Sequence, residues 1–220
     1  MLAGHCGDQA DTAASRVELS ARGECVLHTG ATDNRRYGRR LWLDKQRREV
    51  RPEGDLQLRR ATIDDLPLLR GWDAKAHVIA ASGADDAYPW TEELPRDVSW
   101  RELLIGEHDG RPVGVMQIID PQIEETHYWG ECEPNLRAID IWIGEEADLG
   151  RGFGSDMMRL ALERCFADAA VTAVLVDPLA ANERAHRFYE RFGFKRIARR
   201  FFGEDDCFVY RLARGDWPSV

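Results

Sequence analysis

A glycine-rich stretch, LGRGFGSDMM at residues 149–158, carries residue types whose spacing suits chemistry on an anionic ligand. Three glycines and an arginine precede apolar residues at helical spacing. Glycines allow tight turns, and the free amides at the start of a helix form an anion site. The stretch lacks the Gly-Lys-Ser/Thr of a P-loop and the glycine spacing of a dinucleotide fingerprint. It therefore predicts either a diphosphate cradle or a plain strand-to-helix turn.

A second candidate site is the acidic and aromatic segment 120–140. Carboxylates can attract a polycation and can take the proton of an attacking amine, which is nucleophilic only when unprotonated. Aromatic faces beside them suit a sugar ring that bears ammonium groups. The members are Asp120, Glu124, Glu125, His127, Tyr128, Trp129, Glu131, Glu133 and Asp140. A solvated surface charge is the alternative for each acid alone, but a cleft suits Asp140 better than a core position because a buried, unpaired carboxylate is costly.

The elements that must position these residues follow one another regularly from residue 55 onward. Alternating or buried-type apolar patterns predict strands, and apolar residues three and four apart predict helices. The strands are expected at 56–62, at 99–120 as a hairpin turning at Asp109-Gly110, at 136–144, at 171–178 and as a closing pair over 194–214. The helices are expected at 63–78, from the glycine loop to about Asp168, and at 182–193. This order predicts a mixed α/β fold with helices on both faces of one sheet.

Composition and charge narrow the class of protein. The 220 residues are 44% hydrophobic and 31% charged, as in a globular protein. A boundary near 50–55 separates an N-terminal extension of unknown role, residues 1–54, from a domain at 55–220. Residues 1–54 hold ten Arg or Lys against eight Asp or Glu, so the acid surplus behind the net charge of −9 lies in the domain. That surplus argues against a nucleic-acid partner and favours a small cationic ligand.

Targeting and cysteine patterns favour a cytoplasmic protein. No apolar run approaches the ~20 residues of a membrane span, and the first residues do not resemble a signal peptide. The five cysteines are odd in number and never in CxxC spacing, which argues against both a disulfide framework and a zinc site. We expect no metal and no membrane partner.

A further motif, C-terminal to the glycine loop, helps to interpret that loop. Residues Asn182, Ala185, Tyr189, Gly193 and Phe194 form the pattern N-x2-A-x3-Y-x3-G-F. Together with the R-G-x-G loop, this pattern resembles the GNAT superfamily of acetyl-CoA-dependent N-acetyltransferases over about residues 56–213. The resemblance implies a GNAT-like acyltransferase fold with a central, mostly antiparallel sheet.

Within that superfamily, residues 133–154 and 176–194 look like the aminoglycoside 6′-N-acetyltransferases. Leu149 stands where GNAT enzymes usually carry Gln or Arg, and these relatives tolerate leucine there. Ala138 replaces the glycine of their Arg-Gly-Ile-Asp, and Asp140 and Asp177 fall on their two site aspartates.

The resemblance implies a role for each matching position. Asp140 would serve the reacting amine, and Tyr189 would protonate the leaving thiolate, with simple packing as the alternative for Tyr189. Acetyl-CoA would bind through a splayed strand, the loop amides and an asparagine, namely Ile141, Ile143, Gly150, Arg151, Gly152, Phe153, Gly154, Ser155 and Asn182. The substrate would contact Asp86, Trp90, Trp129, Glu131, Glu133, Asp140 and Asp177.

The implied activity is direct acetyl transfer from acetyl-CoA to the 6′-amine of an aminoglycoside within a ternary complex, without a covalent enzyme intermediate. Two alternatives stay open. One is acylation of another amine, such as a siderophore lysine or a protein amino group. The other is a non-catalytic acyl-CoA-binding sensor. Homodimers are common in this superfamily, and the sequence leaves the oligomeric state open.

Overall fold

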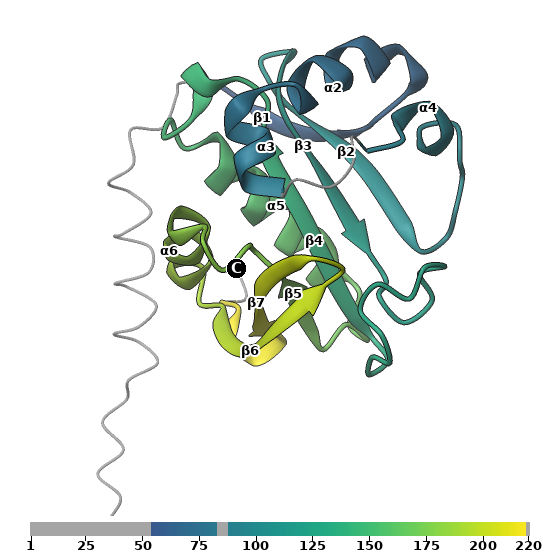
Figure 1. Cartoon of the computed structure of the whole chain (residues 1–220), viewed down its shortest axis with the longest axis vertical. Coiled ribbons are helices and arrows are strands. Elements are labelled where there is room, and N and C mark those ends of the chain that lie inside the picture. The colour runs from purple at the N-terminus through teal and green to yellow at the C-terminus, as the bar shows by residue number, and fades with distance from the viewer. Residues whose placement is uncertain (1–53, 83–87, 219–220) are drawn as a thin grey trace, which may run out of the picture.

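A computed structural model describes residues 54–82 and 88–218 of the chain (Figure 1). The predicted extension 1–54 and the predicted site residue Asp86 lie outside the described residues, apart from Gly54. The described strands form one seven-stranded sheet in the order β1-β2-β3-β4-β5-β7-β6. Their bounds are β1 (Leu56–Arg60), β2 (Arg101–His108), β3 (Arg111–Ile119), β4 (Leu136–Ile143), β5 (Ala173–Val176), β6 (Lys195–Phe202) and β7 (Asp205–Ala213).

Every pairing in this sheet is antiparallel except that of β4 with β5. The turn between β2 and β3 shows why the sequence signal was reliable. Asp109 has φ 50° and Gly110 has φ 76°, as a two-residue hairpin turn requires, and Asp and Gly tolerate that conformation. The mixed α/β class and the mostly antiparallel sheet are confirmed.

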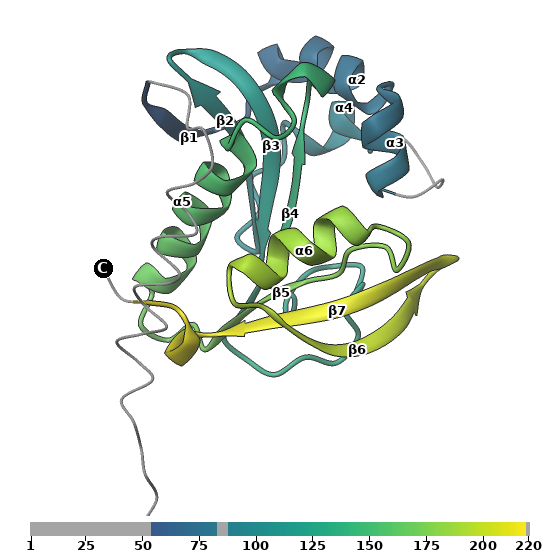
Figure 2. The ribbon, with the colours of Figure 1, turned by 90° about the vertical axis from the view of Figure 1, so that its left-hand side faces the viewer.

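Helices cover both faces of the sheet, as Figure 2 shows. One face carries η1 (Ile63–Asp65), α2 (Leu66–Asp73), α3 (Ala76–Ser82) and α4 (Trp90–Glu93); the other carries α5 (Phe153–Ala167) and α6 (Glu183–Arg191). Two further short turns are η2 (Glu146–Asp148) and η3 (Arg214–Asp216). The helix expected over 63–78 is therefore broken into η1, α2 and α3. α2 ends at Asp73, one residue after Trp72, and α3 begins at Ala76. The ring of Trp72 packs so closely on Gly144 that any side chain there would collide with it.

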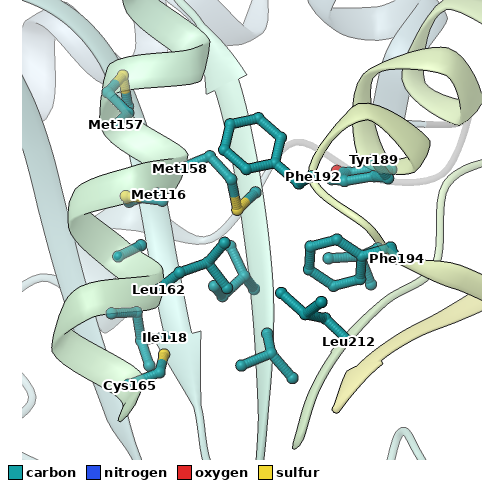
Figure 3. Close-up of a cluster of buried hydrophobic side chains, with 14 of the residues drawn as sticks. Met116, Ile118, Met157, Met158, Leu162, Cys165, Tyr189, Phe192, Phe194 and Leu212 are labelled. Carbon is teal, nitrogen blue, oxygen red and sulfur yellow. The ribbon is translucent and has the colours of Figure 1, made fainter. Parts of the chain in front are cut away.

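The main core lies between α5, α6 and the sheet (Figure 3). Met157, Met158 and Leu162 of α5 are fully buried, because their helical spacing places them on one face. Phe192 and Phe194, which follow α6, close the same core from the other side. This packing fixes α5 and α6 beside each other at the sheet. No helix in the described residues is long and apolar enough to cross a membrane.

Candidate active site

A cavity of about 770 Å³ opens where the two halves of the sheet part. Its lining comes from α3 and α4, from β2 to β4, from the loop 120–135, and from the ends of β5, α6 and β7. Of the predicted residues, the structure brings Trp129, Asp140, Ile141, Asp177 and Tyr189 together in its wall.

The parting of β4 from β5 creates this space. The two strands pair only from Leu136↔Ala173 to Ala138↔Leu175, although β4 continues to Ile143. The amide of Gly144 donates to the carbonyl of Val113 at 3.0 Å. Because backbone groups alternate along a strand, those of Ile141 and Ile143 point away from β3 and toward the gap.

One of these backbone groups already has a partner. The carbonyl oxygen of Ile143 lies 2.9 Å from Nε2 of His77, a residue of α3. This contact requires the His77 tautomer with its proton on Nε2. Backbone hydrogen bonding to a linear ligand arm is therefore more readily available at Ile141 than at the carbonyl of Ile143.

The glycine loop joins η2 to α5 in a conformation that needs glycine. Gly150 has φ 77°, and Gly152, the N-cap residue of α5, has φ 92°. Gly152 has no side chain with which to cap the helix, so the first-turn amides from Phe153 to Ser155 are directed outward from the helix start. Such amides, at the positive end of a fifteen-residue helix, favour an anion.

A buried acid anchors this loop. Asp148, only 4% exposed, accepts hydrogen bonds from Arg111 at 2.7 and 3.0 Å and from Arg151 at 3.2 Å. The Arg151 side chain stays about half exposed, and its guanidinium lies 5.3 Å from the Phe153 ring centre. The loop is therefore rigidly held while its arginine stays accessible. The ring of Phe153 is itself buried, which leaves its amide as the group that can serve a ligand.

Asp140 and Asp177 form an acidic pair in the cavity wall. Burial and the nearby charge of Asp177 raise the pKa of Asp140 to about 7. Burial also raises the pKa of Asp177, whose Oδ2 accepts a hydrogen bond from the Tyr128 hydroxyl at 2.7 Å. Two neighbouring, partly buried carboxylates disfavour each other's ionised form. The pair can therefore hold an ammonium group, and Asp140 is poised to accept a proton near neutral pH.

Tyr189 lies in the same wall. It projects from α6 and is 7% exposed. Burial, followed by the charges of Asp140 and Asp177, raises the pKa of its hydroxyl. The hydroxyl therefore keeps its proton at neutral pH, as a general acid must before it reacts.

Other predicted residues lie elsewhere or have structural partners. Asn182 caps α6, and its Oδ1 accepts the Ala185 amide at 3.0 Å. Trp90 is buried in the core between α2, α4 and the sheet, and its indole donates to Asp73 at 2.5 Å. Glu131 and Glu133 are exposed and are not among the residues that line the cavity.

The cavity also contains polar residues that the sequence reading did not identify. Arg101, Glu93, Tyr88 and Gln117 lie in its wall as one connected network. A signal for Arg101 was present, since it shares a strand face with the buried Leu103 and would be misplaced there without a partner. Within the described residues, no three His, Cys, Asp or Glu side chains group as a metal ion would need.

Comparisons with known protein families, sequences and structures agree on one family. The acetyltransferase (GNAT) domain model matches residues 62–201. Aminoglycoside N(6′)-acetyltransferase type 1 of Serratia marcescens is 29% identical over 73% of this chain and 84% of its own, and that of Klebsiella pneumoniae is 31% identical over 63% and 73%. The crystal structure of aminoglycoside acetyltransferase AAC(6′)-Ib with coenzyme A and kanamycin superposes with a TM-score of 0.66 at 26% identity, covering 74% of this chain and 96% of that one.

Proposed function

The chain belongs to the GNAT acetyltransferase family, and from this premise we propose that it transfers the acetyl group of acetyl-CoA to the 6′-amine of an aminoglycoside. The single observation that carries the proposal is the acidic pair, Asp140 and Asp177, in a cavity that also holds the Tyr189 hydroxyl. Relatives of this chain are named as aminoglycoside N(6′)-acetyltransferases, which supports this choice of amine.

The residues fit acetyl-CoA as the acetyl donor. The outward amides from Phe153 to Ser155 and the charge of Arg151 suit its diphosphate. The backbone of Ile141, free of β5 pairing, suits its amide-bearing arm. When bound there, acetyl-CoA supplies a thioester whose carbonyl carbon an amine can attack.

The side chains of this chain then divide the proton transfers. Asp140 takes a proton from the bound ammonium, directly or through a water molecule, so that the nitrogen lone pair becomes nucleophilic. Asp177 stabilises the ammonium form of the incoming amine and thereby helps to hold the substrate. As the new C–N bond forms and the C–S bond breaks, Tyr189 gives its proton to the departing sulfur. The nitrogen then loses its second proton, which restores the Tyr189 hydroxyl. The products are an N-acetylated sugar and free coenzyme A, and no side chain is acylated.

The compartment that we propose for this reaction is the cytoplasm. Cys132, Cys165 and Cys207 are free thiols in the part of the chain that the structure describes. Unpaired thiols are typical of reducing compartments. Acetyl-CoA is also a cytoplasmic metabolite.

Release of free thiol from acetyl-CoA tests the proposal. The acceptors are kanamycin, tobramycin and lysine-bearing compounds, each at several concentrations. We expect kanamycin or tobramycin to stimulate release with saturation. If coenzyme A binds and no amine stimulates release, the enzymatic reading is wrong; stimulation by the lysine-bearing compounds alone would move the substrate to another amine class.

A further inference from the structure

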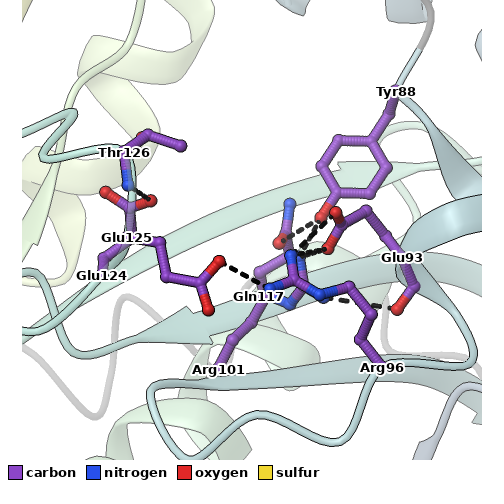
Figure 4. Close-up of polar contacts among 8 residues, drawn as sticks. All are labelled: Tyr88, Glu93, Arg96, Arg101, Gln117, Glu124, Glu125 and Thr126. Atoms are coloured by element: carbon purple, nitrogen blue, oxygen red, sulfur yellow. Dashed lines mark hydrogen bonds and ion pairs between the residues drawn. The ribbon is translucent and has the colours of Figure 1, made fainter.

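The acids that line the cavity are not equally available to a cationic substrate. Glu93 is bound by Arg101 at 2.6 Å and by Arg96 at 3.0 Å. Glu125 is bound by the same Arg96 at 2.5 Å. These four charges alternate in sign and cancel, so this wall carries two charged pairs and no net negative charge (Figure 4).

Two further acids have partners within the chain. Glu124 accepts the backbone amides of Thr126 at 2.6 Å and Tyr128 at 3.0 Å, and its pKa is lowered although burial opposes the shift. Asp73 accepts the indole N–H of Trp90. These hydrogen bonds come from uncharged groups, so they occupy the two carboxylates without neutralising them. The remaining acids of the lining, Asp140, Asp177 and Asp205, lie on the opposite wall, at β4 and at the ends of β5 and β7.

Arg101 is the buried centre of the neutral wall. Its side chain is 4% exposed, and it donates to the Tyr88 hydroxyl at 2.6 Å and to the backbone carbonyl of Glu93 at 3.3 Å, besides its ion pair with the Glu93 carboxylate. A buried arginine with these partners is held in one orientation. Removing it would leave the Glu93 carboxylate with Arg96 alone, on the cavity side.

Gln117 marks the border between the two walls. Its Oε1 accepts the Tyr88 hydroxyl at 3.1 Å, so the nitrogen, a donor, is the other end of the carboxamide. The side chain lines the cavity, although Gln117 is only 4% exposed. On the neighbouring strand Asp140 is the direct cross-strand partner of Gln117. The cavity floor thus changes from an N–H donor to a carboxylate acceptor between two adjacent side chains.

We propose that the wall formed by Tyr88, Glu93, Arg96, Arg101 and Gln117 is a subsite for an uncharged, oxygen-bearing part of the amine substrate. Arg101 sets this specificity because it keeps Glu93 paired. Hydroxyl or carbonyl oxygens can accept hydrogen bonds from Gln117 there, whereas an ammonium group meets no free carboxylate. This inference rests on the proposed function, which identifies the substrate as an aminoglycoside amine. It adds that the charged part of the bound substrate lies by Asp140 and Asp177 and an uncharged part lies against this wall.

The test compares two ligands in the presence of coenzyme A: methyl 6-amino-6-deoxyglucoside, with one ammonium group, and kanamycin, with several. Calorimetry gives both dissociation constants without requiring turnover. In Arg101→Met the carboxylates of Glu93 and Glu125 share Arg96 alone, which leaves one negative charge in excess on this wall. An additional ammonium should bind there, so kanamycin should bind roughly tenfold more tightly relative to the monoamine, as for a hydrogen bond to a charged group.

Two further variants make the result decisive. The double variant Arg101→Met/Glu93→Gln removes both charges and should restore the wild-type ratio of the two dissociation constants. Glu93→Gln alone leaves the charge of Arg101 unneutralised, so kanamycin should bind more weakly relative to the monoamine. This variant keeps the test valid if Arg101→Met does not fold. Equal changes for both ligands in the single variants, or a double variant that does not restore the ratio, would overturn the subsite. Absence of acetylation with the binding ratios as expected would overturn the proposed function alone.

Discussion

Asp140 and Asp177 occupy equivalent register positions along two parallel strands that stop pairing before reaching them. The last paired residues are Ala138 and Leu175. Each aspartate stands two positions further along the chain, Asp140 within β4 and Asp177 directly after the end of β5. Continued pairing would have placed the two carboxylates side by side. The parting of the strands instead leaves a cavity into which both project, so a ligand can lie between or beside them.

Replacement of Asp140 by Asn should separate chemistry from coenzyme binding. The carboxamide cannot accept the amine proton, so turnover with kanamycin should fall by roughly 10²- to 10⁴-fold, the contribution of a positioned general base. The affinity for coenzyme A should stay within a factor of about two, because the variant retains the helix-terminal anion site. Steady-state kinetics and calorimetry measure the two quantities. Unchanged turnover would show that another group takes the proton.

The pH profile should reflect the raised pKa of Asp140. Below about pH 7 the carboxyl group is protonated and cannot act as a base, so kcat/KM should decline as pH falls through this value. In Asp177→Asn the neighbouring negative charge is gone, and the midpoint should move to lower pH, while burial keeps part of the shift. A profile with the same midpoint in both proteins would assign the titration to a different group.

Tyr189→Phe removes the proposed acid and leaves the ring. Because burial keeps the Tyr189 hydroxyl protonated, its loss should lower kcat by roughly 10- to 1000-fold, at or below the usual contribution of general acids. The packing of Tyr189 against Phe194 should persist, so thermal unfolding should change little. A kcat near that of the wild type would show that water, and not Tyr189, protonates the leaving sulfur.

Two glycines of the loop should respond differently to alanine. Gly152 has φ 92°, so Gly152→Ala should destabilise the protein by about 1 kcal/mol or more and weaken coenzyme A binding. Gly154 lies within α5, where an added Cβ would meet Phe188 and Ile143 at the ordinary contact distances of 3.8 and 3.9 Å. Gly154→Ala should therefore keep the stability, and any loss of coenzyme affinity would report close approach of the ligand. Thermal unfolding and calorimetry provide the comparison, and equal stability losses would contradict this account.

Local sequence signals predicted the framework well. The Asp109-Gly110 turn and the glycine loop before α5 each require a backbone conformation that few residues adopt, so their positions could be inferred without tertiary information. Asp140 was recognisable as a polar residue within an apolar strand. In each case the physical cause lies in a few neighbouring residues, so a single sequence is enough to recognise it.

The remaining parts of the site depend on tertiary packing. Trp90 shares its residue type with ligand-binding aromatics, yet it fills the core, and the acidity of Glu131 and Glu133 does not indicate on which side of the loop they lie. The ion pair of Arg101 with Glu93 joins β2 to α4, and no local pattern specifies such a contact. Asp140 and Asp177 come near each other because β4 and β5 are paired neighbours, and the cavity beside them exists because the two strands then diverge.

The most direct test of the central claim is the position of the acetyl group in the product. Kanamycin is incubated with acetyl-CoA and the full chain, released thiol is quantified, and the product is assigned by NMR. The account predicts one acetyl group per thiol released, carried on the 6′-amine. Acetylation at a different amine, or thiol release without acetylated product, would contradict it.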